Sequence, residues 1–119
     1  MQNVRFMECE TNDTWARDHG AITMLDSEGA SLLDFMFNGW GLKFASDKDN
    51  LITRQAVEAG FLNGRYVNRL GFVLEGGSIE SDGLGTLLTT SEMCIRERIG
   101  AIRWCFHCFA GGAIHHLKK

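Results

Sequence analysis

The residues best suited to chemistry lie in one polar stretch, residues 11–20, with the sequence TNDTWARDHG. Trp15 and Asp18 in this stretch suit a planar cation, because a carboxylate accepts paired N–H bonds from it and an indole face attracts its charge. Polar side chains gathered between two apolar segments are typical of a loop that carries function. A capped turn around a buried Trp is the alternative, and the spacing alone slightly favours that alternative.

A second candidate is Glu75, which directly follows the apolar run 72–74 and precedes two glycines. Paired glycines let another backbone or a ligand approach closely, and a carboxylate at the end of a strand can orient a His or bind a cation. A strand-end Glu that faces solvent is the alternative, and the residues alone leave the two readings even. The glycines do not form a phosphate loop, because no Gly-Lys-Ser/Thr follows them and no helix pattern begins there.

The C-terminal part, residues 91–119, holds three of the four Cys and three of the four His. Cys105 and Cys108 have Cys-x-x-Cys spacing, and Cys94, His115 or His116 could complete the four ligands of a structural zinc site. Aromatic residues around the motif and two glycines after it argue against zinc. A Cys nucleophile paired with a His is a further reading, but no spacing identifies the pair.

The composition describes one domain of 119 residues, of which 45% are hydrophobic, enough to bury a core. No apolar run could span a bilayer and the N-terminus lacks a signal-peptide core, so we expect a soluble, cytoplasmic protein. Residues 1–90 carry 7 Lys and Arg against 13 Asp and Glu, whereas residues 91–119 carry 5 against 2. An acidic body disfavours nucleic acid and suits a small cationic ligand. The shift near Thr90 is the one candidate boundary.

The apolar pattern predicts a mixed α/β (α+β) fold whose strands position these candidates. Strands are expected over residues 4–9, 21–25, 32–37 and 72–74, with a hairpin turn at 26–29. The Ser-Asp-Gly sequence at 81–83 predicts a second hairpin between strands 78–80 and 84–90. A helix over residues 47–59 lies between strands and therefore predicts one crossover connection.

The predicted helix 47–59 has acidic residues in its first turn, which favour the positive end of the helix dipole. Ile52, Ala56 and Ala59 make a narrow apolar stripe, and Gly60 can end the helix in the left-handed conformation. Ahead of this helix, residues 38–41 are predicted to form a loop. Trp40 lies between two glycines there, and packing on the core is favoured over lining a pocket.

Three segments together closely resemble the agmatine deiminase family, which belongs with arginine and peptidylarginine deiminases to the guanidine-modifying enzymes. They are residues 11–23 (TNDTWARDHGAIT), 37–45 (FNGWGLKFA) and 72–90 (FVLEGGSIESDGLGTLLTT). The resemblance covers roughly residues 3–94. Several motifs in the same order make it far more specific than any one of them.

The resemblance implies a pentein-type α/β propeller of five ββαβ modules around a central site. It also implies hydrolysis of agmatine to N-carbamoylputrescine and ammonia, a step in putrescine synthesis, with no metal or organic cofactor. In that reaction a Cys thiolate attacks the guanidinium carbon, ammonia leaves, and water releases the product, while a His transfers protons. The implied partner is therefore a small guanidino cation, agmatine.

Matched residue by residue, the resemblance assigns three positions of this chain. Asp18 is similar to the catalytic carboxylate that binds the guanidinium, and Trp15 to part of the substrate pocket beside it. Glu75 is similar to the acidic residue that supports the catalytic His. Each assignment agrees with the chemistry of the residues, since a planar cation needs charge-assisted paired hydrogen bonds and a carboxylate fixes the tautomer of a His.

The chain also departs from the family pattern. The family has sequence ahead of this Met1, and its His-x-Asp motif and nucleophilic Cys lie downstream of the EGG stretch. Beyond a loose likeness at residues 91–94 the match fails, and the His pair after the glycines at 111–112 resembles the approach to the family's Cys only by chance. We therefore expect an inactive fragment. Residues 1–90 would be a partial deiminase domain of about one and a half modules, and residues 91–119 a misjoined or disordered tail.

Two alternatives to an agmatine deiminase stay open. One is a deiminase for another guanidino compound of the peptidylarginine type, because the part of the pocket that reads the far end of the substrate is not evident. The other is a non-catalytic zinc-binding module built on the Cys and His residues of the tail. The sequence indicates no nucleic-acid or membrane partner and leaves the oligomeric state open.

Overall fold

The computed structural model describes the backbone of residues 4–82, 86–90, 105–110 and 113–116, and side chains within 4–82 and 87–89. Contacts divide the chain into two compact units, Met1–Gly76 and Gly77–Lys119, which are described separately. No helix among the described residues is long and apolar enough to cross a membrane.

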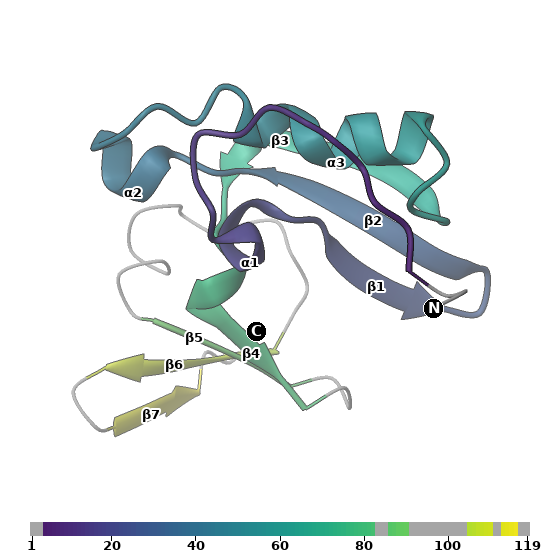
Figure 1. The fold of residues 1–119 in the computed structure, drawn as a ribbon. Helices are drawn as coiled ribbons and strands as arrows, with labels where there is room; N and C mark the ends of the chain where they lie inside the picture. Colours follow the sequence, from purple (N-terminus) through teal and green to yellow (C-terminus); the bar gives the residue numbers. More distant parts are fainter. Residues whose placement is uncertain (1–3, 83–85, 91–104, 111–112, 117–119) are drawn as a thin grey trace. The chain divides into compact units, whose positions relative to one another are not determined.

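The first unit is a three-stranded sheet covered by one helix (Figure 1). Strands β1 (Ile22–Asp26) and β2 (Gly29–Met36) form an antiparallel hairpin, and β2 pairs in parallel with β3 (Arg65–Val73). Helix α3 (Asp49–Glu58) makes the crossover between β2 and β3 and packs against both. The predicted first hairpin and single crossover are therefore confirmed, and the element order is ββαβ.

The turn of the first hairpin is built by two residues with distinct tasks. The Asp26 carboxylate accepts a hydrogen bond from the backbone N–H of Glu28 at 2.8 Å, and Gly29 takes a φ of 121°, which a side chain would disfavour. Because Asp26 already pairs with Gly29, β2 begins three residues before the predicted strand 32–37. Its Leu32 and Asp34 are buried beneath the helix layer.

Helix α3 ends as predicted, with Gly60 at a φ of 69° just after it, but it begins two residues later than predicted. The predicted apolar stripe is wrong, because Ala59 is exposed and Ile52 only half-buried. The buried positions are Asp49, Thr53 and Ala56. Two of these three are polar, so hydrogen-bond partners rather than apolar area decide which face of the helix points inward.

The predicted strand over residues 4–9 is also wrong. This segment has no strand pairing and runs along α3 instead, as Figure 1 shows. Arg5 donates to the carbonyl of Gly60 at 2.9 Å and places its guanidinium 4.3 Å from the centre of the Phe61 ring. The alternation of residue types does not bury one face, since Phe6 is 89% exposed.

The predicted strand 72–74 is the end of a longer strand, β3. Pairing with β2 shifts between Phe35 and Met36, whose partners are Arg69 and Val73. Residues 70–72 lie outside the regular register, which separates the apolar run from the rest of β3. The backbone N–H of Leu74 then donates to the carbonyl of Met36 at 3.1 Å. The chain therefore leaves the sheet beside the end of β2.

The second unit is a four-stranded sheet that follows the 3₁₀ turn η1 (Gly76–Ser78). Its strands, in sheet order, are β4 (Ile79–Ser81), β5 (Thr86–Thr90), β6 (Cys105–Ala110) and β7 (Ala113–His116). The predicted second hairpin is confirmed by the antiparallel pairing of β4 with β5, although residues 83–85 of its turn lie outside the described part of the chain. The β5–β6 pair is parallel and the β6–β7 pair antiparallel.

A buried carboxylate in the first sheet gives a test of this packing. Asp34 is 1% exposed and accepts a hydrogen bond from the Tyr66 hydroxyl at 2.7 Å. Burial raises the pKa of Asp34 above its ordinary value, although hydrogen bonds from Tyr66 and Thr53 oppose the shift. Burial and this carboxylate also raise the pKa of Tyr66 to about 12, so the hydroxyl remains a donor.

We predict that acidification favours the wild-type chain over an Asp34→Asn variant. A carboxyl group with a raised folded-state pKa binds its proton more tightly when folded, so its contribution to stability is complete below the unfolded pKa and is lost as pH rises through the folded value. In urea unfolding, the free energy of unfolding of the wild type relative to that of the variant should be higher at pH 4 than at pH 7. Parallel changes in the two proteins would contradict the raised pKa of Asp34.

Candidate functional site

Three segments that carry the candidate residues meet at one edge of the first sheet. The short helix α1 (Ala16–His19) lies just before β1, whose first residue, Ile22, pairs with Leu33 near the end of β2. The loop after β2 begins at the same edge, and β3 ends beside it at residues 73–74. This edge is formed by the carboxyl ends of two parallel strands, which is where open α/β sheets bind ligands.

The backbone of Gly76 lies directly against that of α1. A Cβ atom placed on Gly76 would lie 2.2 Å from the carbonyl oxygen of Arg17 and 3.4 Å from its carbonyl carbon. The predicted close approach at the glycine pair is therefore real, and the approaching group is a backbone. Because Asp18 follows Arg17 and Glu75 precedes Gly76, the contact brings together the two segments that carry these half-buried carboxylates.

Trp15 stands at the start of α1 with its indole 66% exposed. Its backbone N–H donates to the Asp13 carboxylate at 2.8 Å, and its carbonyl accepts from the N–H of Asp18 at 2.9 Å. The alternative of a capped turn around a buried Trp is thus right about the turn and wrong about the burial. Trp15 therefore caps the turn that carries Asp18.

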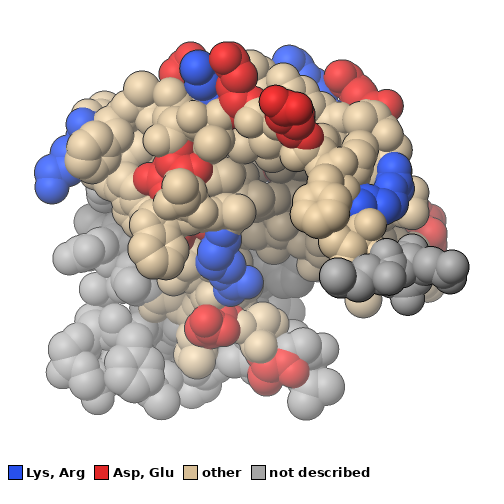
Figure 2. Space-filling view, viewed as in Figure 1, with Lys and Arg blue, Asp and Glu red and all other residues tan. Residues whose placement is uncertain are grey.

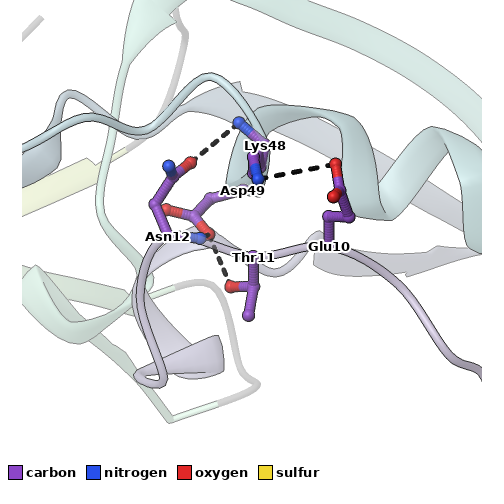
Figure 3. A network of polar contacts seen from close by, with 5 residues as sticks. All are labelled: Glu10, Thr11, Asn12, Lys48 and Asp49. Atoms are coloured by element: carbon purple, nitrogen blue, oxygen red, sulfur yellow. Dashed lines mark hydrogen bonds and ion pairs between the residues drawn. The ribbon is translucent and has the colours of Figure 1, made fainter.

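The polar loop ahead of α1 is anchored to the start of α3 by Asp49, as Figure 3 shows. One oxygen of this 1% exposed carboxylate accepts from the Thr11 hydroxyl at 2.7 Å and from the backbone N–H of Asn12 and Asp13 at 2.8 and 3.2 Å. The backbone N–H of Lys48 donates to the Asn12 side chain at 2.9 Å. These bonds fix the loop between two elements that are far apart in the sequence.

The loop after β2 begins at a strand end that Asn50 of α3 holds in place. The Asn50 side chain accepts from the backbone N–H of Phe37 and donates to its carbonyl, both at 2.8 Å, as a neighbouring strand would. The Ser46 hydroxyl donates to the same carbonyl at 2.9 Å. Phe37 is 1% exposed and forms the apolar floor of this sheet edge.

Trp40 lies on that floor in an unusual backbone conformation. The predicted loop forms the helical turn α2 (Gly39–Leu42), in which Trp40 has a φ of 62° and Leu42 a φ of 67°. The Trp40 ring meets Phe37 edge-on at 5.4 Å, yet the residue is 38% exposed. Its indole N–H donates to the Asp13 carboxylate at 2.7 Å. The predicted core packing therefore holds for the contact with Phe37 but does not account for the polar end of the ring.

The Asp13 carboxylate accepts one hydrogen bond on each oxygen, from the Trp15 backbone and from the Trp40 indole. The hydrogen bond from Trp15 is the main reason that the pKa of Asp13 lies below its ordinary value, followed by the bond from Trp40 and, to a smaller extent, the charge of His19. Sequence reasoning passed over Asp13. The sequence signal for it is the Asp two positions before a Trp, which suits an Asx turn.

His19 is a further residue that sequence reasoning did not single out. It is 7% exposed and packs against the Phe37 ring, with 5.9 Å between ring centroids. Neither ring nitrogen has a hydrogen-bond partner among the described residues. Since an unpaired buried polar group costs free energy, His19 is an exception that packing alone does not explain.

The Cys and His residues proposed as zinc ligands lie outside the described side chains. Cys94 falls in a segment that is not described, while Cys105, Cys108, His115 and His116 are known only as backbone in β6 and β7. Among the described residues, no group of three or more His, Cys, Asp or Glu side chains could hold a metal ion. Figure 2 shows basic and acidic side chains of the described residues interspersed on one face, with no continuous basic patch there.

Comparison with known proteins connects this arrangement to one enzyme family. The family model of the Porphyromonas-type peptidyl-arginine deiminases matches residues 1–99. The agmatine deiminases of Stutzerimonas stutzeri and Pseudomonas aeruginosa are 39% and 40% identical to this chain over 101 residues. Each match covers 80% of this chain and 27% of the relative, so the chain spans about a quarter of the length of these relatives.

A solved structure is similar in fold as well as in sequence. The substrate-bound agmatine deiminase from C. jejuni superposes with a TM-score of 0.68 at 42% identity. This match covers 81% of the present chain and 28% of the C. jejuni chain.

We predict that Gly76→Ala destabilises the chain, whereas Gly71→Ala does not. The added methyl group at position 76 must displace the Arg17 backbone, which should lower the free energy of unfolding by about 1–3 kcal/mol. Position 71 has no atom within 4 Å of an added Cβ and a φ outside the left-handed region, so Ala is tolerated there. Urea unfolding of both variants measures the difference. Equal stabilities would contradict the contact between α1 and Gly76.

Proposed function

Because the chain belongs to the Porphyromonas-type peptidyl-arginine deiminase family, we propose that it forms the guanidinium-binding part of an agmatine deiminase. The observation that supports this most is the backbone contact of Gly76 with α1, which brings the segments of Asp18 and Glu75 together beside the exposed indole of Trp15. The identity of about 40% to agmatine deiminases over most of this chain adds weight to agmatine as the substrate.

Each of the three residues has a defined task in the proposed site. Asp18 accepts paired N–H bonds from the guanidinium, and the Trp15 indole attracts its positive charge. Glu75 supports a His that transfers protons. In the whole reaction a Cys thiolate adds to the guanidinium carbon, one nitrogen leaves as ammonia, and water cleaves the carbon–sulfur bond. The net change is agmatine and water to N-carbamoylputrescine and ammonia.

The proposed enzyme is a propeller of five ββαβ modules that works in the cytoplasm without a metal or organic cofactor. The order β1, β2, α3 and β3 supports one such module. Residues 1–90 would then carry about one and a half modules, and residues 91–119 would form a tail outside the family pattern. A zinc module in that tail remains the alternative from another class, and elemental analysis of the purified chain distinguishes the two by the presence or absence of stoichiometric zinc.

A peptidylarginine deiminase is a second candidate, because the matching family model carries that description. Trp15, Asp18 and Glu75 would serve both substrates equally, since all three act on the guanidinium and its reaction. The two substrates differ at the end far from the guanidinium, which is an amine in agmatine and a peptide backbone in peptidylarginine.

We predict that the chain of residues 1–119 binds agmatine by its guanidinium. In a nuclear magnetic resonance titration, agmatine should move the amide signals of Trp15 and Asp18, with an affinity at least about tenfold above that for putrescine, which lacks the guanidinium. Asp18→Asn should remove this preference, because a neutral amide cannot accept a charge-assisted pair. The matched control Asp47→Asn changes an exposed carboxylate just before α3 and should leave the preference for agmatine intact.

The outcome for the second substrate follows from the same titration. Binding of agmatine in preference to Nα-acetylarginine amide supports the agmatine assignment, and the reverse supports peptidylarginine. Equal binding of putrescine and agmatine would overturn the proposed guanidinium site. The samples should release no ammonia, because the 119-residue sequence contains no His-x-Asp motif.

A further inference from the structure

Besides Asp18, the proposed guanidinium site has a second carboxylate near Trp15, that of Asp13. Both oxygens of Asp13 already accept hydrogen bonds from this chain, at 2.8 Å from the Trp15 N–H and at 2.7 Å from the Trp40 indole. A guanidinium needs two oxygens of one carboxylate for a paired contact. Because each oxygen keeps a second lone pair, these two bonds do not exclude such a contact. What they establish is that the Asp13 carboxylate is oriented by the Trp15 backbone and the Trp40 indole.

The two bonds of Asp13 act on parts of the site that are distant in sequence. The bond to the Trp15 N–H fixes the backbone at the start of α1, and the next turn follows through the bond from the Asp18 N–H to the Trp15 carbonyl at 2.9 Å. The bond to the indole holds Trp40 from the loop after β2. One carboxylate thus joins α1 to that loop.

Trp40 is held in a backbone conformation that its residue type does not favour. A φ of 62° is unfavourable for a residue with a side chain relative to the right-handed region. The surrounding contacts must offset this cost, and they include the edge-on packing against Phe37, with 5.4 Å between ring centroids, and the hydrogen bond to Asp13. Residues kept in such conformations cluster at ligand-binding sites, where their position matters more than their stability.

We propose that Asp13 is the positioning residue of the guanidinium site and that it fixes the Trp15 backbone and the Trp40 indole at the place that receives the cation. This inference rests on the proposed function. Asp13 holds both Trp residues and the start of α1, so Asp18 is presented in a fixed orientation. Trp40 becomes a second aromatic residue of the site beside Trp15. Asp13 is itself fixed, because its backbone N–H donates to the buried Asp49 at 3.2 Å.

The test compares agmatine binding by wild-type chain and an Asp13→Asn variant. An amide offers one oxygen acceptor and one N–H₂ donor, so it cannot accept both bonds and must release Trp15 or Trp40. We expect roughly tenfold weaker agmatine binding, together with a shift of the Trp40 indole N–H signal in the nuclear magnetic resonance spectrum. The matched control is Asp26→Asn, because Asp26 also accepts a backbone N–H two residues on at 2.8 Å but has no hydrogen bond to a Trp within the described part of the chain.

A second variant keeps the test decisive if Asp13→Asn does not fold. Trp40→Phe retains a ring on Phe37 but loses the indole N–H, and it should weaken agmatine binding several-fold. The double variant should lose less affinity than the two single variants combined, because both changes act on the Asp13–Trp40 contact.

The outcomes separate this inference from the function on which it rests. Unchanged agmatine affinity in Asp13→Asn or in Trp40→Phe, with binding by the wild type intact, overturns the positioning role and leaves the proposed function standing. A wild-type chain that does not bind agmatine overturns the proposed function, and the inference with it. A loss of affinity in Asp26→Asn equal to that in Asp13→Asn also overturns the inference, because the effect would not depend on the Trp residues.

Discussion

The buried carboxylate of Asp49 is the interaction on which the candidate site depends. It lies at the first position of α3, where the helix dipole favours a negative charge, and one of its oxygens accepts from three donors of the polar loop. Hydrogen bonds to a charged acceptor are stronger than those between neutral groups, and leaving a buried donor unpaired is costly. The loop therefore has one low-energy position against the helix.

A short series of polar contacts connects Asp49 to the exposed Trp residues and fixes their positions. Asp49 holds the backbone of Asp13, and the carboxylate of Asp13 holds Trp15 and Trp40. Close backbone packing fixes the segment of Glu75 against α1, since only a residue without a side chain fits where Gly76 meets Arg17. Apolar burial provides the floor under these contacts through Phe37, but it does not choose their positions. Among the described residues of the first unit, more of the buried side chains are polar than apolar for this reason.

The sequence predicted those features that local interactions decide. The first hairpin follows from an Asp and a Gly at its turn, and the end of α3 from Gly60, since each depends on a few neighbouring residues. The inward face of α3 was not predictable in this way. Its partners, Asp34 for Thr53 and the polar loop for Asp49, are brought to it only by the fold.

The candidate site divides along the same line. Residue type and family resemblance suffice to single out Trp15, Asp18 and Glu75, whereas their roles in binding and catalysis stay predictions. The contact that brings the segments of Asp18 and Glu75 together required the structure, as did the bond from Trp40 to Asp13. Asn12 and Asp49 lie 37 positions apart, and no local pattern connects them.

The most direct measurement of this account is amide hydrogen exchange in an Asp49→Ala variant, followed by titration with agmatine. The account predicts faster exchange at the Asn12 and Asp13 amides and loss of the agmatine-induced shifts at Trp15 and Asp18, while the amides that pair β2 with β3 keep their protection. Retained shifts at Trp15 and Asp18 in a variant whose Asn12 and Asp13 amides exchange freely would contradict it, because the site would then not depend on this anchor.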